Sequence, residues 1–319
     1  RQVMPDGKIR ARGVAMAMQG SSISNCDVGS VTVKLSDEGT YHITVGCTDM
    51  GTGCDTIIAQ FAADVLETPI DNISVYGVDT DISPYDSGSY ASSTTYLTGM
   101  AAVKACEQLR ERIIALAAVR MNKDASALTF DGENVIDESD GAKMSLFDIA
   151  TASMCNNEIS LEVTYSHSSP VSPPPFMAAC AEIEADPETG AIELLDYTAC
   201  VDCGTVVNTN LARVQTEGGL LQGIGMTLYE DIWYDERGKN LSNSFMQYKV
   251  PSRLDTDRIR VEFDSSYEPT GPFGAKSIGE IVINTPAPAI ADAVYNATGV
   301  WINELPITPE KILKGMKVI

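Results

Sequence analysis

The sequence predicts an α+β protein made of two similar units, each a mixed-sheet α/β arrangement of a hairpin, a helix, a strand, a loop and a helix. The chain has 319 residues, which is enough for two domains. Its hydrophobic content of 44% is enough to fill a core at this size. The same order of expected elements occurs twice, so we place the first unit, with a connector, at residues 1–170 and the second at 171–319.

The first half opens with a strand near residues 9–18 and a hairpin. Residues 31–35 and 41–45 alternate apolar and polar side chains across an Asp-Glu-Gly-Thr turn, which is typical of a β-hairpin. The elements expected next in this half are an amphipathic helix around 57–65, a short strand at 73–76 and a long helix at 92–121.

The second half repeats this order. Residues 178–184 and 192–200 form a hairpin across an Asp-Pro-Glu-Thr-Gly turn, a sequence rich in turn-forming residues. The last helix has Thr285 as its expected N-cap, Pro286 at its first position and Gly299 past its end. Between hairpin and last helix we expect a helix at 208–228 and a strand at 259–263.

The region between the halves has weaker patterns. We expect a short helix at residues 144–150, a strand at 161–165 and a proline-rich crossing loop at 169–175.

Charge and composition exclude several classes of function. The net charge of −22, without a basic stripe, argues against a nucleic-acid partner. No apolar run reaches about 18 residues, so no membrane span is expected, and the first residues show no signal-peptide pattern. Eight scattered cysteines and two histidines predict a reduced cytoplasmic protein without a side-chain metal site. Cys200 and Cys203 form a C-x-x-C pair, for which we favour a structural role because no second pair is present.

Two glycine-rich stretches are candidates for function. The loop Gly-Pro-Phe-Gly-Ala-Lys-Ser-Ile-Gly-Glu, residues 271–280, surrounds one lysine and ends on one carboxylate. It does not match the phosphate-loop pattern, so a surface turn and a catalytic carboxylate loop are the alternatives. The helix at 215–225 carries four glycines, which permit either close approach to a bulky ligand or close helix packing.

The loop at 271–280 resembles the glutamate loop of the molybdenum hydroxylases, the xanthine dehydrogenase and aldehyde oxidase family. Three further segments resemble cofactor-contacting segments of that family: Cys-Thr-Asp-Met-Gly-Thr-Gly at 47–53, Gly-Ser-Tyr-Ala-Ser-Ser-Thr at 88–94, and Arg-Val-Gln-Thr-Glu-Gly-Gly at 213–219. Thr52 stands where the family usually has glutamine. The fold implied is the second molybdenum-binding domain of the family.

The resemblance also implies roles for individual residues. Glu280 is the implied general base, and the loop with Ser22, Ile23 and Ser24 lies where the family often places a substrate-facing aromatic. No side chain ligates molybdenum directly, because the pterin dithiolene holds the metal. The implied cofactor contacts are Met50, Gly51, Thr52, Ala91, Ser92, Ser93, Thr94, Gln215, Lys276, Ser277 and Gly279.

The family's first molybdenum-domain half, its iron–sulfur cysteines and its flavin fingerprint have no counterpart in this sequence, so the chain is either a cut fragment or a naturally separate subunit. The resemblance is strongest to the medium molybdopterin subunit of nicotinate dehydrogenase. It implies a molybdenum–molybdopterin cytosine dinucleotide with a terminal sulfur or selenium. It also implies three partners: a second molybdopterin subunit, a [2Fe-2S] subunit and a FAD subunit.

The implied reaction is hydroxylation of an electron-poor N-heteroaromatic carbon with water as the oxygen source. The first expectation is nicotinate to 6-hydroxynicotinate, with electrons passing through iron–sulfur clusters and FAD to NADP. The alternatives are a purine or aldehyde hydroxylase and, from another class, a non-catalytic scaffold that only binds cofactor.

Overall fold

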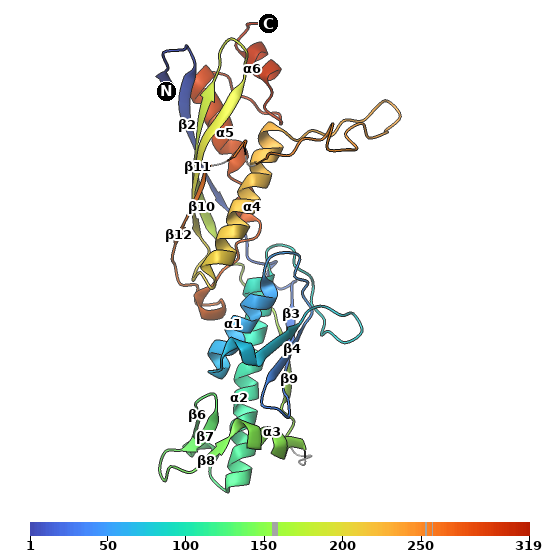
Figure 1. The fold of residues 1–319 in the computed structure, drawn as a ribbon, viewed down its shortest axis with the longest axis vertical. Coiled ribbons are helices and arrows are strands. Elements are labelled where there is room, and N and C mark those ends of the chain that lie inside the picture. Colours follow the sequence, from blue (N-terminus) through green and yellow to red (C-terminus); the bar gives the residue numbers. More distant parts are fainter. Residues whose placement is uncertain (155–158, 253, 257) are drawn as a thin grey trace. The chain divides into compact units, whose positions relative to one another are not determined.

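The computed structural model describes residues 1–319 except 155–158, 253 and 257, and the chain divides into two compact units (Figure 1). Unit 1 comprises Arg1–Gln19, Pro174–Ser266 and Ile278–Ile319. Unit 2 comprises Gly20–Pro173 and Tyr267–Ser277. The chain therefore passes between the units four times: after Gln19, after Pro173 in the proline-rich stretch, after Ser266, and after Ser277 in the loop that leads to Glu280.

The composition of the units differs from the predicted halves, 1–170 and 171–319, at two segments. Strand β2 (Ile9–Met18) pairs antiparallel with β10 (Phe176–Ala185) along its whole length, so it belongs to the sheet of the second half. Residues 267–277 lie with unit 2. Pairing between distant strands, which local sequence patterns do not encode, accounts for the first difference.

Unit 2 is built on a four-stranded sheet in the order β5-β4-β3-β9. Strands β3 (Gly29–Leu35) and β4 (Tyr41–Val45) form the predicted hairpin, and β4 pairs in parallel with β5 (Ile73–Tyr76). Helices α1 (Cys54–Leu66) and α2 (Gly99–Met121) pack on its apolar face. The remaining elements of the unit are β9 (Glu162–His167), 3₁₀ turns at Ile70–Asn72, Ala125–Ala127 and Pro272–Gly274, a π-helical turn at Thr94–Thr98, β6 (Leu128–Phe130), β7 (Asn134–Asp137), β8 (Lys143–Ser145) and α3 (Leu146–Met154).

The helix predicted at 144–150 begins later than expected. Residues 143–145 pair with β7 as strand β8, and α3 starts only at Leu146. The sheet formed by β6, β7 and β8 was not predicted, because its strands have only three or four residues, too few for a sequence period to be recognised.

Unit 1 is built on a five-stranded sheet in the order β1-β2-β10-β11-β12. The hairpin of β10 and β11 (Ile192–Asp202) is the predicted one, and β11 pairs in parallel with β12 (Ile259–Asp264). Helices α4 (Thr209–Leu228) and α5 (Pro286–Thr298) cover one face of this sheet (Figure 1). The remaining elements of the unit are β1 (Gln2–Val3), a 3₁₀ turn at Ile281–Ile283 and α6 (Pro309–Gly315).

The two units repeat one topology, which confirms the predicted fold class. In each, an antiparallel hairpin leads to a helix, a strand parallel to the hairpin's second strand, a loop and a further helix. In unit 2 the order is β3-β4-α1-β5-α2, and in unit 1 it is β10-β11-α4-β12-α5. As predicted, α5 begins at Pro286 after Thr285 and ends before Gly299, whose φ is 77°.

Close packing accounts for two of the four glycines on α4. A Cβ at Gly219 would lie 2.1 Å from Val282 Cγ2, and one at Gly223 would lie 2.6 Å from Pro286 Cγ, so both glycines let α4 approach the start of α5 closely. A Cβ at Gly225 would meet only the end of the Glu230 side chain, and one at Gly218 would meet open space.

Within the part of the chain that the structure describes, no helix combines the length and the apolar character needed to cross a bilayer.

One buried carboxylate makes the stability of unit 2 depend on pH. Asp137 is only 2% exposed, lies 2.8 Å from Lys123 Nζ and accepts a hydrogen bond from Ser139 N. The ion pair and these hydrogen bonds lower the pKa of Asp137 to about 2. Because this pKa lies below the unfolded value, the stabilisation is present at neutral pH and is lost as the pH falls from about 4 to about 2.

Melting temperatures across that range should fall more steeply for the wild type than for Asp137→Asn. An equal dependence of melting temperature on pH in the two proteins would contradict this.

Candidate functional site

The loop at 271–280 makes a tight turn before it reaches Glu280. Gly274 N donates to Gly271 O (3.1 Å), and Phe273 and Gly274 both have positive φ, 49° and 86°. A Cβ at Gly271 would lie 1.9 Å from Ala275 O, so only glycine fits there. The Phe273 ring stacks on Phe61 of α1 with centroids 5.9 Å apart, which anchors the turn within unit 2.

After the turn, the loop is fixed by a buried serine pair. Ser21 Oγ and Ser277 Oγ lie 2.8 Å apart, and Ser277 N donates to Ser21 Oγ (3.1 Å). Lys276 is 7% exposed and Ser277 is 2% exposed, so both predicted cofactor residues are buried in the protein itself. The protein around them therefore fixes both side chains.

Gly279 and Glu280 are exposed where the loop enters unit 1. Glu280 precedes the 3₁₀ turn Ile281–Ile283, and Ile283 N donates to Glu280 O (3.3 Å). Gln19 Nε2 donates to Glu280 Oε2 (3.3 Å), which orients the carboxylate. Sequence reasoning missed Gln19, because it follows strand β2 and lies 261 residues before Glu280 in the chain.

Two loops of unit 2, residues 20–28 and 86–94, meet at the predicted substrate and cofactor positions. Ser22 N donates to Ala91 O (2.8 Å), and Ser87 N donates to Val28 O (3.0 Å). Ser22, Ala91 and Ser92 have φ of 86°, 48° and 55°, a region that side chains other than glycine rarely adopt. Such strain concentrates at functional sites.

These loops leave polar atoms buried without a hydrogen-bond partner of ordinary geometry. Among the described residues there are four such side-chain atoms, and three of them lie here: Ser22 Oγ, Asp27 Oδ1 and Ser89 Oγ. Buried polar groups in proteins are nearly always paired, so three in adjoining loops indicate a ligand that supplies the partners. We call residues 20–28 and 86–94 together the polar cradle.

Sequence reasoning missed Asp27 and Ser89. A hydrogen bond with the Asp27 carboxylate raises the pKa of the neighbouring Tyr90 phenol, so Asp27 already engages another residue of the cradle. Of the predicted pocket residues, Ile23 is 49% exposed and Ser24 is half-buried. The run of small polar residues around both loops was visible in the sequence, but which of their atoms lack partners is a property of the folded chain alone.

Ser93 and Thr94 start the helix that leaves the cradle. Ser93 Oγ donates to Gly88 O (3.0 Å), which closes the loop on itself. Thr94 opens the π-helical turn Thr94–Thr98, and such turns occur often at functional sites. Of the predicted cofactor residues 91–94, Ala91 and Ser92 thus lie on strained backbone and Thr94 lies in the π-helical turn, whereas Ser93 has ordinary helical dihedrals.

The loop before α1 holds Met50, Gly51 and Thr52, all from the predicted cofactor set. Asp49 Oδ1 accepts hydrogen bonds from Gly51 N (2.9 Å) and Gly53 N (3.1 Å). Partial burial acts to raise the pKa of Asp49, but these backbone hydrogen bonds hold it below its ordinary value. Asp49 therefore shapes this loop, and the Gly51 amide is engaged within it.

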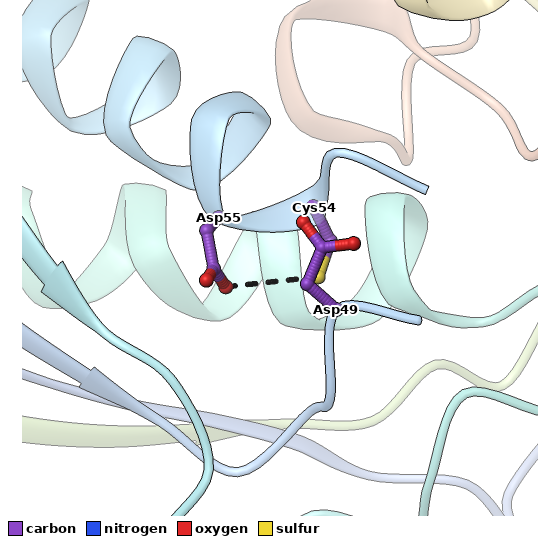
Figure 2. A group of neighbouring side chains, drawn as sticks. All are labelled: Asp49, Cys54 and Asp55. Atoms are coloured by element: carbon purple, nitrogen blue, oxygen red, sulfur yellow. Dashed lines mark hydrogen bonds between the residues drawn. The ribbon is translucent and has the colours of Figure 1, made fainter. Parts of the chain in front are cut away.

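Asp49, Cys54 and Asp55 form a small group at this loop (Figure 2). Their potential ligand atoms lie within 4.8 Å of one another, and Cys54 Sγ donates to Asp55 Oδ1 (3.8 Å). Loop capping by Asp49 and the start of α1 account for the arrangement, so we assign no metal to it.

The predicted residues therefore fall in two places. Unit 2 holds those of the cradle, of the loop before α1, and Lys276 and Ser277. Unit 1 holds Gln215, Gly279 and Glu280. Gln215 is half-buried on α4. Three residues further along the helix, a Cβ added at Gly218 would meet no other atom within 4 Å.

A family model described as a molybdopterin cofactor-binding domain matches residues 1–257. Probable hypoxanthine oxidase XdhD of Escherichia coli K12 is 38% identical over 310 residues, which span 97% of this chain and 32% of that protein. The chain belongs to the xanthine dehydrogenase family of molybdenum hydroxylases. It matches the molybdopterin-binding portion of this family, as the glutamate loop predicted.

Two further comparisons agree. The gamma subunit of the 6-hydroxypseudooxynicotine dehydrogenase complex of Paenarthrobacter nicotinovorans is 31% identical over 321 residues, 98% of this chain and 40% of that one. The crystal structure of quinoline 2-oxidoreductase from Pseudomonas putida 86 superposes with a TM-score of 0.89 at 26% identity, covering 98% of this chain and 42% of that one. This molybdenum hydroxylase chain thus spans about a third to two-fifths of the relatives it matches.

The unpaired atoms of the cradle fit a molybdopterin. Two hydroxyls can donate and accept hydrogen bonds, and one carboxylate oxygen can accept them. A pterin with its phosphate offers N–H donors together with oxygen acceptors, so it can satisfy all three atoms.

We expect substitutions at two neighbouring serines, Ser22 and Ser21, to change the free energy of unfolding differently. Ser22→Ala removes an unpaired buried hydroxyl, so the free energy of unfolding should not fall and should rise by up to about 1 kcal/mol. Ser21→Ala is the matched control: its buried hydroxyl is paired with Ser277, and its loss should lower the free energy of unfolding by about 1–2 kcal/mol. Urea unfolding of the two variants measures this. Similar destabilisation by both would show that Ser22 Oγ is satisfied within the protein.

Proposed function

We propose that this chain is the molybdopterin-binding part of a multi-subunit hydroxylase that adds oxygen from water to an electron-poor carbon of an N-heteroaromatic ring. The observation that carries the proposal is the polar cradle, with its three unpaired buried atoms and its strained backbone at Ser22, Ala91 and Ser92. Family membership supports the cofactor class, and the names of the relatives support the ring class.

The cofactor proposed is molybdenum–molybdopterin cytosine dinucleotide, with sulfur or selenium as the terminal ligand. When bound, it supplies the two-electron oxidation and the oxygen that enters the product. Within unit 2, Ser22, Asp27 and Ser89 hydrogen-bond it in the cradle, and residues 50–52, 91–94 and 276–277 add further contacts. Gln215 and Gly279 of unit 1 are proposed as cofactor contacts on the family resemblance alone. The buried serine pair keeps residues 276–277 in place while the cofactor enters.

Glu280 is the proposed general base. Its carboxylate is exposed, so a reacting group can reach it, and it lies on a short stretch of backbone between a glycine and a 3₁₀ turn. Gln19 Nε2 orients Oε2 through its hydrogen bond. In its ionised form the carboxylate takes the proton from the oxygen nucleophile as the bond to the ring carbon forms.

Glu280→Gln tests this role. The amide keeps the size of the side chain but cannot accept the proton, so turnover should fall by about 10²–10⁴-fold, or about 3–5 kcal/mol of activation free energy. Molybdenum and pterin content of the assembled enzyme should not change. The measurement is the rate of enzyme reduction by substrate, at matched molybdenum content.

Glu217→Gln on α4 is the control, because Glu217 is a half-buried carboxylate to which we assign no catalytic role. It should stay within a few-fold of the wild type. Reduction of the Glu280→Gln enzyme at the wild-type rate would mean that the chain only holds cofactor and is the non-catalytic scaffold.

The first substrate candidate is nicotinate, giving 6-hydroxynicotinate, with electrons passing to NADP. No aromatic side chain is present at positions 22–24 to stack on a purine, which favours a single ring. A purine is the second candidate, because the relative with 38% identity is named a probable hypoxanthine oxidase.

Steady-state assays of the assembled enzyme should rank nicotinate above hypoxanthine and xanthine, and all three above benzaldehyde, in kcat/KM. A purine ahead of nicotinate would transfer the assignment to the second candidate. An aldehyde ahead of every heterocycle would overturn the proposed ring class.

The proposed partners are a second molybdopterin subunit that completes the cofactor site, a [2Fe-2S] subunit and a FAD subunit. We place the enzyme in the cytoplasm, since Cys47, Cys54 and Cys106 are buried thiols outside any disulfide. In the C-x-x-C pair, Cys200 is exposed and Cys203 is buried.

A further inference from the structure

A long loop of unit 1 connects α4 to β12. Residues 231–250 project from the end of α4 as the orange loop in Figure 1, and we call these residues the arm. No arm residue belongs to the hydrophobic core of unit 1, and none is classed as buried. The arm is therefore not needed to complete the core of the unit that carries it.

The arm is nevertheless ordered by its own hydrogen bonds. Tyr248 Oη donates to the carboxylate of Glu230 and closes its base. At its tip, Leu241 N donates to Trp233 O (2.7 Å) and Gly238 N donates to Asp235 O (2.9 Å). The conformation is thus set in advance, which lowers the entropy cost of binding a partner.

Large apolar side chains cover the arm. Trp233 is 62% exposed, Tyr234 63%, and Phe245 and Met246 79% and 81%. The other exposed apolar side chains of the arm are Ile232, Leu241 and Val250. A concentration of this kind marks an interaction site in a protein that must stay in solution.

The exposed apolar area of the arm is large enough to contribute substantially to a protein–protein interface. Aromatic side chains bury about 150–250 Å² each, so covering the exposed parts of Trp233, Tyr234 and Phe245 alone removes roughly 400 Å² from water. That is about half of one partner's share of a standard protein interface, about 800 Å². Aromatic residues of this type are also the ones that dominate binding energy.

We propose that the arm docks against the portion of the molybdenum subunit that this chain does not span, carried by the second molybdopterin subunit. This inference rests on the proposed function for the existence of that subunit, and it adds the surface that binds it.

Two observations favour this occupant over a second copy of the chain. The match to quinoline 2-oxidoreductase covers 98% of this chain but 42% of the other, so more than half of that protein lies outside the match. In such relatives, the part of the protein outside the match can cover the segment that corresponds to the arm. A second copy would bring another net charge of −22, and the two copies would repel each other.

Photo-crosslinking in the native host tests the contact. A benzophenone amino acid is placed at Trp233, at Phe245 and, as a control, at Phe147, which is 60% exposed on α3 of unit 2. Positions 233 and 245 should crosslink to a polypeptide similar in sequence to the part of hypoxanthine oxidase XdhD outside the matched third. Crosslinks mainly to a second copy of this chain, or to an unrelated protein, would overturn the proposal. So would equal yields to that polypeptide from position 147.

Paired substitutions measure the contribution of the arm. Trp233→Ala with Phe245→Ala should weaken assembly with the second subunit at least 10-fold, while Phe147→Ala should leave it unchanged. The unfolding midpoint of the double variant should equal that of the wild type, since neither side chain belongs to the core. Assembly of the double variant at wild-type affinity would contradict the docking role. A complex that forms through the arm but holds no molybdenum would instead reject the proposed function and leave the docking intact.

Discussion

The backbone hydrogen bond from Ser22 N to Ala91 O holds together two loops whose buried polar atoms the protein itself does not satisfy. Each unpaired buried group costs about 1–3 kcal/mol, so the three in the cradle together cost about 3–9 kcal/mol. That is a large fraction of the 5–15 kcal/mol by which a typical protein is stable. A bound group that supplies the missing hydrogen bonds would remove this cost. The rest of unit 2 holds the two loops in their strained conformation.

The repeated topology explains where the candidate residues lie. In unit 2 the loop with residues 50–52 joins the hairpin to α1, and the loop with residues 91–94 lies between β5 and α2. In unit 1 the corresponding segments lead into α4, which carries Gln215, and from β12 towards α5, past Glu280. Loops that follow strands and precede helices are the usual ligand-binding places of α/β folds. The candidate residues of both repeats therefore lie at equivalent places of the topology.

Local chemistry made much of the fold predictable from sequence. The turn residues of both hairpins, and the Thr285, Pro286 and Gly299 signals around α5, act within a few residues of the structure they specify. The pairing of β2 with β10 was not predictable, because it joins segments more than 150 residues apart. The short strands β6 to β8 lacked enough residues to show a period.

Some residues of the candidate site were likewise predictable from the sequence and others were not. Glu280 and the glycine loops have distinctive sequence patterns, whereas Gln19, Asp27 and Ser89 are ordinary residues whose role depends on three-dimensional neighbours. The arm is a similar case. Its aromatic residues could equally have been core residues, and only their exposure separates the two possibilities.

We propose that the cradle of unit 2 receives the molybdopterin, and an experimental structure of the enzyme assembled with its partner subunits and loaded with cofactor tests this. We predict that Ser22 Oγ, Asp27 Oδ1 and Ser89 Oγ each lie within hydrogen-bonding distance of a polar atom of the cofactor or of a water that it holds. Pairing of these three atoms with side chains of a partner subunit, with the cofactor bound elsewhere, would contradict it.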